Sequence, residues 1–190
     1  NNSGITLRAV GLGLILIPIN CYWIMYTEMV WWAQFPTTMS LFFNVIFCLA
    51  VIIPINLLFR RISPKLSLDQ RELLVIYIML CMASAVASHD NLQVLIPMIG
   101  HAFWYDTPEN EWKDTFWEYI PNWLSVRDKN ILTGYYEGES SFYNIDYIKA
   151  WLRPAVPWIG FITVLLSVMI FINVILRKQW IEREKLAYPI

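Results

Sequence analysis

Four apolar stretches constrain the fold of this chain more than any other feature. A bilayer core about 30 Å thick requires around 20 residues of helix to cross it, and the stretches reach or approach that length. Hydrophobic residues make up 57% of the sequence, which is more than soluble domains of this size contain. The sequence therefore predicts an all-α polytopic membrane protein whose four transmembrane helices lie at about 5–30, 41–59, 70–88 and 156–176.

The distribution of charge indicates how these helices are oriented, because short cytoplasmic loops retain Lys and Arg. If both termini lie on one side of the membrane, that side carries nine basic and four acidic residues, from Arg8 and from segments 60–72 and 177–185. The opposite side carries five basic and eleven acidic residues. We therefore expect a multi-pass protein of the cell membrane with both termini in the cytoplasm.

The long segment before the last helix, residues 89–153, is expected to form an extracytoplasmic lid within a single membrane domain spanning 1–190. Its apolar first part, 92–105, is too short to cross a bilayer, and we expect it to be interfacial, re-entrant or the continuation of a broken helix. The remainder is polar and rich in Trp, which fits a lid lying on the outer membrane surface.

Helix-capping residues predict where three helices begin. Ser67 and Gln70 have the spacing of a capping box at the start of the third apolar helix. Thr107-Pro108-Glu109 reads as a cap, a first-turn proline and a first-turn acid. Asn144 is expected to cap another helix within the lid.

Polar residues at the ends of the apolar stretches are the candidates for a transport path. An ionisable group within a membrane helix is costly unless it is paired or hydrated. Glu28, at the outer end of the first helix, is expected either to take up a coupling proton or to reach water beside Trp31. A helix break exposes backbone polar groups at transporter sites, and such a break is expected where the third apolar stretch ends. The residues there either line the path or cap the helix: Ser88, His89, Asp90 and Asn91.

Small residues within the apolar stretches predict close helix packing. Small side chains let neighbouring membrane helices approach each other. Gly11 and Gly13 provide them in the first stretch, and Ala83 and Ala87, four residues apart, in the third.

Several classes of function find no support in the sequence. It contains no hydrolase elbow, no metal-binding His-Glu pair and no Gly-rich phosphate loop, so we expect no enzyme, no metal and no cofactor. The spacing of His89 and His101, with Pro97 between them, does not suit a pair of haem ligands on one helix. No basic patch suggests nucleic acid as a partner.

Short motifs near both ends of the chain and in its middle resemble the oligopeptide transporter superfamily. Residues 6–13 resemble the opening of its first helix, and residues 184–189 resemble a Lys-Leu-aromatic-Pro signature that begins a later helix. Three further motifs resemble an uncharacterised bacterial branch of that superfamily; these lie at 72–77, 109–112 and 120–124.

The resemblance implies a proton-driven importer of peptides or metal chelates in a bacterial inner membrane, of which this chain is the N-terminal portion. Better-known members carry a Gly-rich, Ser-containing turn after the first helix, whereas residues 26–32 here read Tyr-Thr-Glu-Met-Val-Trp-Trp. The alternative is a structural or accessory subunit that scaffolds a larger membrane complex. Expected partners are the lipid bilayer and either the remaining helices of the same protein, other membrane subunits or further copies of the chain.

Overall fold

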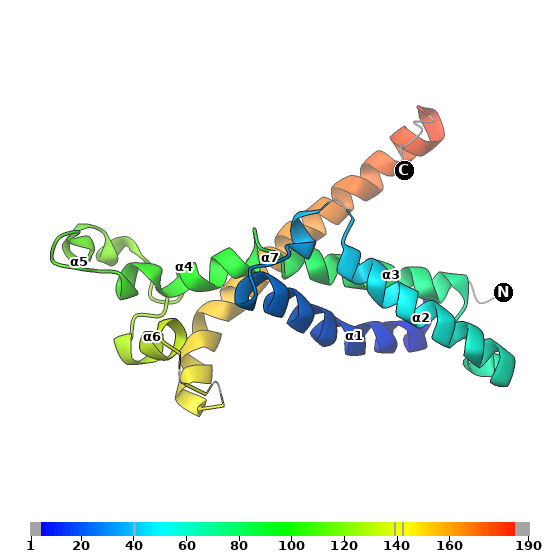
Figure 1. Cartoon of the computed structure of the whole chain (residues 1–190). Coiled ribbons are helices and arrows are strands. Elements are labelled where there is room, and N and C mark those ends of the chain that lie inside the picture. The colour runs from blue at the N-terminus through cyan, green and yellow to red at the C-terminus, as the bar shows by residue number, and fades with distance from the viewer. Residues whose placement is uncertain (1–4, 40, 139, 142, 185–190) are drawn as a thin grey trace. The chain divides into compact units, whose positions relative to one another are not determined.

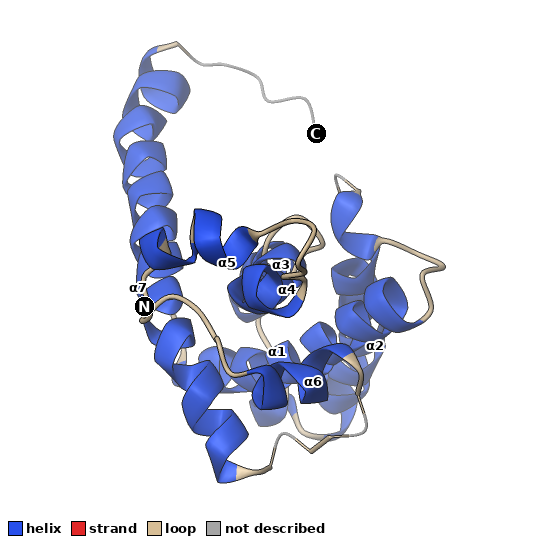
Figure 2. Cartoon of the chain, turned by 90° about the vertical axis from the view of Figure 1, so that its left-hand side faces the viewer, coloured by secondary structure: helices blue, strands red, loops and turns tan. Residues whose placement is uncertain are grey.

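The computed structural model describes residues 5–39, 41–138, 140–141 and 143–184, and within these ranges it consists of helices and turns without a strand (Figure 2). The expectation of an all-α protein is therefore confirmed. The chain divides into two compact units, residues 1–96 and 97–190. Apart from Glu184, the C-terminal motif at 184–189 lies outside the described residues.

The first unit contains three main helices, α1 (Leu7–Met25), α2 (Phe43–Ile62) and α3 (Gln70–Val86). A π-helical turn, η1 (Tyr26–Val30), continues α1, and a short 3-10 helix, η2 (Pro36–Thr38), precedes α2. In Figure 1, α1 and α3 run in the same direction and α2 runs in the opposite one. Val45, Ile76 and Leu80 form the buried apolar core between them.

The capping box of α3 lies two residues beyond the predicted one. Asp69 accepts from the start of the helix and Glu72 reaches back to the Asp69 N–H, at 2.8 Å. Ser67 does not cap this helix, because its hydroxyl donates to the Pro64 carbonyl at 2.8 Å. The prediction of a helix start here was correct in kind and wrong in the residues that form the cap.

Within the part of the chain that the structure describes, three helices are long and apolar enough to cross a membrane, namely Leu7–Val30, Phe43–Ile62 and Ile145–Arg177. Very little of their apolar surface is buried within the chain, which is typical of helices that face lipid or other helices. The predicted third span at 70–88 corresponds to α3, which has 17 residues, at the lower end of the range that crosses a bilayer, and is not among these three helices. The length and composition of these three helices are those of a membrane protein.

In the second unit, residues 97–190, the end of α4 (Leu92–Trp104) packs with α6 (Lys129–Tyr136). The core residues are Ile99, Phe103, Val126 and Leu132. A Cβ at Gly100 would collide with Leu132 Cδ2, so the buried Leu132 side chain would have to shift to admit a larger residue there. The segment 92–105, predicted to be interfacial, re-entrant or the continuation of a broken helix, is helical. The long helix α7 (Ile145–Arg177) completes the unit.

The helix expected to begin at Thr107 begins later, as the short α5 (Trp112–Thr115). The Asn110 side chain holds a turn instead: it donates to the Tyr105 carbonyl at 2.8 Å and accepts from the Thr107 N–H at 3.0 Å. Glu111, the residue before α5, has a φ of 48°, in the left-handed region that lies outside regular helix. By contrast, the cap predicted at Asn144 is confirmed, because its side chain accepts from the Asp146 N–H at 3.0 Å. The expectation of a separate helix there was wrong, since the helix that begins at Ile145 continues to Arg177 and includes the predicted span at 156–176.

Candidate functional site

Three polar layers join α1 to the α3–α4 segment at a nearly constant register. Arg8 pairs with Glu72 and Asn20 with Ser84, each 64 residues apart, and Glu28 pairs with Gln93, 65 residues apart. A constant separation requires the two segments to run parallel and in step. The first unit therefore carries a polar group at each end and one in the middle of an otherwise apolar contact.

The layer at the C-terminal end of α1 surrounds Glu28, whose carboxylate is fully buried. Oε1 accepts from the Thr37 N–H at 2.9 Å and from the Thr37 hydroxyl at 2.8 Å, while Oε2 accepts from Gln93 Nε2 at 2.5 Å. Among the described residues, no Lys, Arg or His side chain forms an ion pair with it. Hydrogen bonds from neutral groups alone leave a buried negative charge incompletely compensated.

Local structure explains how these donors meet. The π-helical turn η1, closed by the Trp31 N–H to the Tyr26 carbonyl at 3.1 Å, carries Glu28 at the end of α1; such turns occur frequently at functional sites. Pro36 opens η2 and leaves the next N–H, that of Thr37, free to donate. Gln93 also donates to the Ala87 carbonyl at 3.1 Å, which links the end of α3 to the start of α4.

Two further polar atoms at this end of the unit are buried without a hydrogen-bond partner, Gln93 Oε1 and His89 Nδ1. The His89 N–H donates to the Thr37 hydroxyl oxygen at 3.2 Å, and its ring meets that of Phe35 edge to face, with centroids 5.4 Å apart. Buried groups of this kind normally have a partner. We refer to Glu28, Thr37, His89 and Gln93 as the Glu28 cluster.

The structure brings together some of the predicted path residues. Glu28 and His89 share Thr37 as a partner, as described above. Ser88, Asp90 and Asn91 form the turn between α3 and α4, where the Ser88 carbonyl accepts from the Asn91 N–H at 3.1 Å. Asp90 is exposed. Sequence reasoning missed Gln93 and Thr37, although an amide in the first turn of the apolar segment 92–105 was a usable signal.

The middle layer is a buried hydrogen-bonded triad from three helices. Asn20 Nδ2 donates to Ser84 Oγ at 2.9 Å, and Asn44 Nδ2 donates to Asn20 Oδ1 at 2.8 Å and to Ser84 Oγ at 3.0 Å. All three side chains are fully buried, and Asn44 Oδ1 has no partner. Hydrogen bonds between polar side chains fix how membrane helices pack, so the triad defines the register of α1, α2 and α3.

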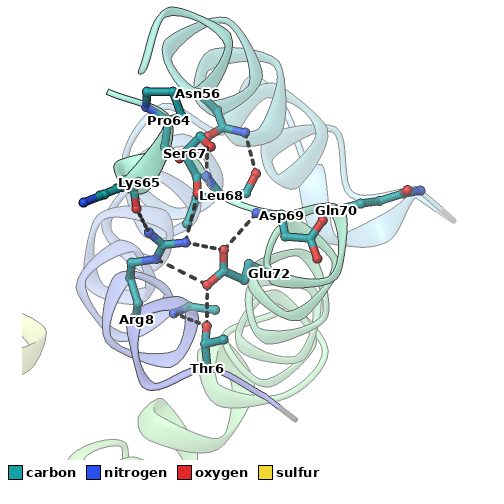
Figure 3. A network of polar contacts seen from close by, with 11 residues as sticks. Thr6, Arg8, Asn56, Pro64, Lys65, Ser67, Leu68, Asp69, Gln70 and Glu72 are labelled. Atoms are coloured by element: carbon teal, nitrogen blue, oxygen red, sulfur yellow. Dashed lines mark hydrogen bonds and ion pairs between the residues drawn. The ribbon is translucent and has the colours of Figure 1, made fainter. Parts of the chain in front are cut away.

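The layer at the N-terminal end of α1 links the start of α1 to the start of α3 (Figure 3). Arg8 Nη2 lies 2.6 Å from Glu72 Oε2, and the same guanidinium donates to the Lys65 and Ser67 carbonyls at 3.1 and 3.0 Å. The Thr6 hydroxyl adds a 2.5 Å hydrogen bond to Glu72 Oε1. Arg8 therefore neutralises its carboxylate partner, in contrast to the situation at Glu28.

The predicted packing residues occupy different environments. Gly13 is buried, and a Cβ there would come within 2.6 Å of Met79 Sδ on α3. Gly11 has open space around its Cα. Ala83 and Ala87 line an apolar groove of about 440 Å³ between α1 and α3.

The arrangement of residues does not favour a metal centre. Among the residues that the structure describes, no group of three or more His, Cys, Asp or Glu side chains is placed to hold a metal ion. The groups around Glu28 donate hydrogen bonds to its carboxylate, so the cluster consists of one buried carboxylate with neutral partners.

Helices of membrane length and a buried carboxylate among neutral donors define an all-helical membrane protein with a candidate ion or proton site. By sequence, the chain belongs to a family of unknown function, DUF6785, whose model matches residues 1–190. No curated protein and no solved structure matches the chain significantly.

Proposed function

We propose that this chain is part of a multi-pass secondary transporter of a bacterial inner membrane, in which the Glu28 cluster takes up and releases the coupling proton. The observation that carries the proposal is the burial of Glu28 among neutral donors only. A buried carboxylate is stabilised by a proton or by a cationic partner. Proton coupling requires a site that alternates between a protonated and an unprotonated state.

The parallel register of α1 and α3 supports a four-span arrangement. With α2 running the opposite way, the three helices alternate in direction (Figure 1), as consecutive crossings do. In this proposal α3 crosses despite its 17 residues, because the turn at Ala87–Asn91 and the first residues of α4 complete the path. Crossing by α7 then returns the chain to the cytoplasmic side, in agreement with the basic residues at 177–185.

The substrates proposed are short peptides or metal chelates, as the resemblance to the oligopeptide transporter superfamily implies. The full-length protein would be reconstituted into liposomes that contain a pH-sensitive dye. Addition of dialanine and trialanine outside should acidify the lumen with the wild-type protein. Glu28→Gln should abolish acidification, because an amide cannot exchange the coupling proton.

The matched control is Glu137→Gln, which removes an exposed carboxylate at the end of α6 and should leave acidification unchanged. Glu28→Asp retains the titrating group and should retain part of the rate. Equal proton movement by wild type and Glu28→Gln would contradict the role of Glu28. Substrate uptake without proton movement would contradict proton coupling.

The alternative, an accessory subunit of a larger membrane complex, is supported by one observation. Among the described residues, none of the most apolar window of α7 is buried, so this part of the helix is free to contact lipid or helices of another subunit. Purification of the native protein under mild detergent distinguishes the two. A stable complex with different membrane subunits, and no transport by the isolated protein, would favour the accessory role.

A further inference from the structure

A polar cavity lies within residues 97–190 and has no part in the proposed proton path. Its volume is about 230 Å³, and it is lined by the loop before α6 and by the first turns of α7. Arg127 and Arg153 both belong to this lining, together with Asn122, Ser125 and Asp128. Two guanidinium groups in one small cavity suit an oxyanion.

The two arginines differ in how firmly they are held. Arg127 Nη2 donates to the Trp117 carbonyl at 3.3 Å and to the Ile120 carbonyl, and the guanidinium carbon lies 4.9 Å from the centre of the Phe103 ring. Its buried Nε has no hydrogen-bond partner among the described residues. The Arg127 side chain is therefore fixed in place.

Arg153, by contrast, is exposed, and its side chain makes no hydrogen bond or ion pair with any other described residue. The carboxylate in the lining, Asp128, is already engaged, because it caps α6 by accepting from the Asn130 N–H at 2.9 Å. The lining thus carries two guanidinium groups, one of them without a partner among the described residues, and one carboxylate. These side chains together have an excess of positive charge, which favours the binding of an anion.

The surrounding charges reinforce this imbalance. Segment 89–153 is acidic, with only five basic residues. Four of these five lie on the two segments that border the cavity: Arg127, Lys129, Lys149 and Arg153. Lys149 and Arg153 are one helical turn apart on α7, so they share a face. The positive charge of this otherwise acidic segment is therefore concentrated beside one cavity, where it favours the binding of an anion.

The position of the cavity along α7 identifies the kind of anion. Arg153 lies three residues before the apolar run that begins at Val156. Trp158, at the start of that run, donates from Nε1 to the Leu124 carbonyl at 3.5 Å, and Trp151 packs against the core of the unit. Trp is enriched at the headgroup level of a bilayer. The cavity therefore lies where lipid phosphates are found.

We propose that this cavity binds the phosphate of an anionic phospholipid, with Arg127 and Arg153 as its cationic ligands and Asn122 as a neutral donor. The acyl chains would lie along the exposed apolar face of α7 that follows Val156. This inference is independent of the proposed transport function, since lipid binding is expected whether or not the protein moves a substrate.

The test uses the full-length protein in detergent, stripped of lipid, with binding measured by native mass spectrometry. Phosphatidylglycerol should bind tightly at one site, and phosphatidylcholine with the same acyl chains should bind at least tenfold more weakly. Arg153→Gln should weaken phosphatidylglycerol binding at least tenfold. Lys113→Gln makes the same change of charge outside the cavity and should have no effect. Arg153→Lys keeps the charge but loses the planar fork, and should lie between wild type and Arg153→Gln.

Equal affinity of wild type and Arg153→Gln for phosphatidylglycerol would overturn the proposal. A similar loss in Lys113→Gln would also overturn it, because binding would then reflect net charge and not this cavity. Glycerol phosphate serves as the soluble form of the headgroup. If it binds as tightly as the lipid and depends equally on Arg153, the cavity is a site for a soluble phosphate and the assignment to a lipid is wrong.

Discussion

Asn20 and Ser84 lie 64 residues apart in the sequence, and their side chains form a fully buried hydrogen bond of 2.9 Å between two parallel helices. The same separation recurs between Arg8 and Glu72. One register therefore aligns α1 with α3, and it places Glu28 beside Gln93 at the far end. Residues in the middle of the helices consequently influence the geometry of the candidate proton site.

Ser84→Ala should destabilise the protein by about 1–3 kcal/mol, because it leaves the buried amide donors of Asn20 and Asn44 without their shared acceptor. Thermal or denaturant unfolding in detergent measures the change. Ser167→Ala is the matched control, since the Ser167 hydroxyl donates only within α7, to the Thr163 carbonyl at 2.7 Å. A loss of equal size in both variants would show that the triad contributes nothing specific.

The ion pair between Arg8 and Glu72 should show a favourable coupling of about 1 kcal/mol in a double-mutant cycle. Arg8 is 44% exposed on its side chain and Glu72 only 6%, so the pair is partly screened by water. The variants are Arg8→Gln, Glu72→Gln and both together, and the measurement is the free energy of unfolding. Additive effects of the single variants would indicate that Thr6 and the capping box, and not Arg8, hold Glu72.

Gly13→Leu should destabilise the first unit by about 1–3 kcal/mol, as overpacking of a close contact does. The new side chain would meet Met79, whose Sδ lies 2.6 Å from the Cβ position. Gly11→Leu is the control on the same helix, where the Cβ position is open, and it should be tolerated. If the two variants unfold alike, α1 and α3 do not approach each other at Gly13.

Tyr136 should remain protonated well above the ordinary phenol range. Burial, followed by the nearby Tyr135 and Tyr105 hydroxyls, raises its pKa from 10.0 to about 12, and its hydroxyl donates to the Pro97 carbonyl at 2.6 Å. A raised pKa in the folded state means that the fold favours the protonated phenol. Its contribution to stability is therefore complete below pH 10 and is lost as the pH rises toward 12.

The measurement for Tyr136 is the phenolate absorbance of the folded protein during an alkaline titration. Tyr136→Phe should remove the step at highest pH, whereas Tyr143→Phe, which changes a side chain that is 95% exposed, should leave that step in place. A titration curve without a high-pH step in the wild-type protein would contradict the burial of Tyr136.

Candidate residues could be identified from the sequence only in part. Glu28 stood out because a carboxylate at the end of an apolar helix is unusual, and His89 because it follows a helix break. Gln93 and Thr37 did not stand out, since neutral polar residues near turns are common. Their importance depends on contacts across 65 and 9 residues of sequence.

The sequence by itself determined the all-helical character of the described chain and located the helices Leu7–Val30 and Phe43–Ile62 closely, because length and hydrophobicity are local properties of a segment. It placed the start of the last helix at 156, whereas the helix begins at Ile145. It also determined the cap at Asn144. Tertiary structure alone decided that α1 and α3 run parallel in one register and that Asp69, not Ser67, caps α3. Such outcomes depend on which helix faces meet and on which competing hydrogen bonds form, and neither is encoded in a single segment.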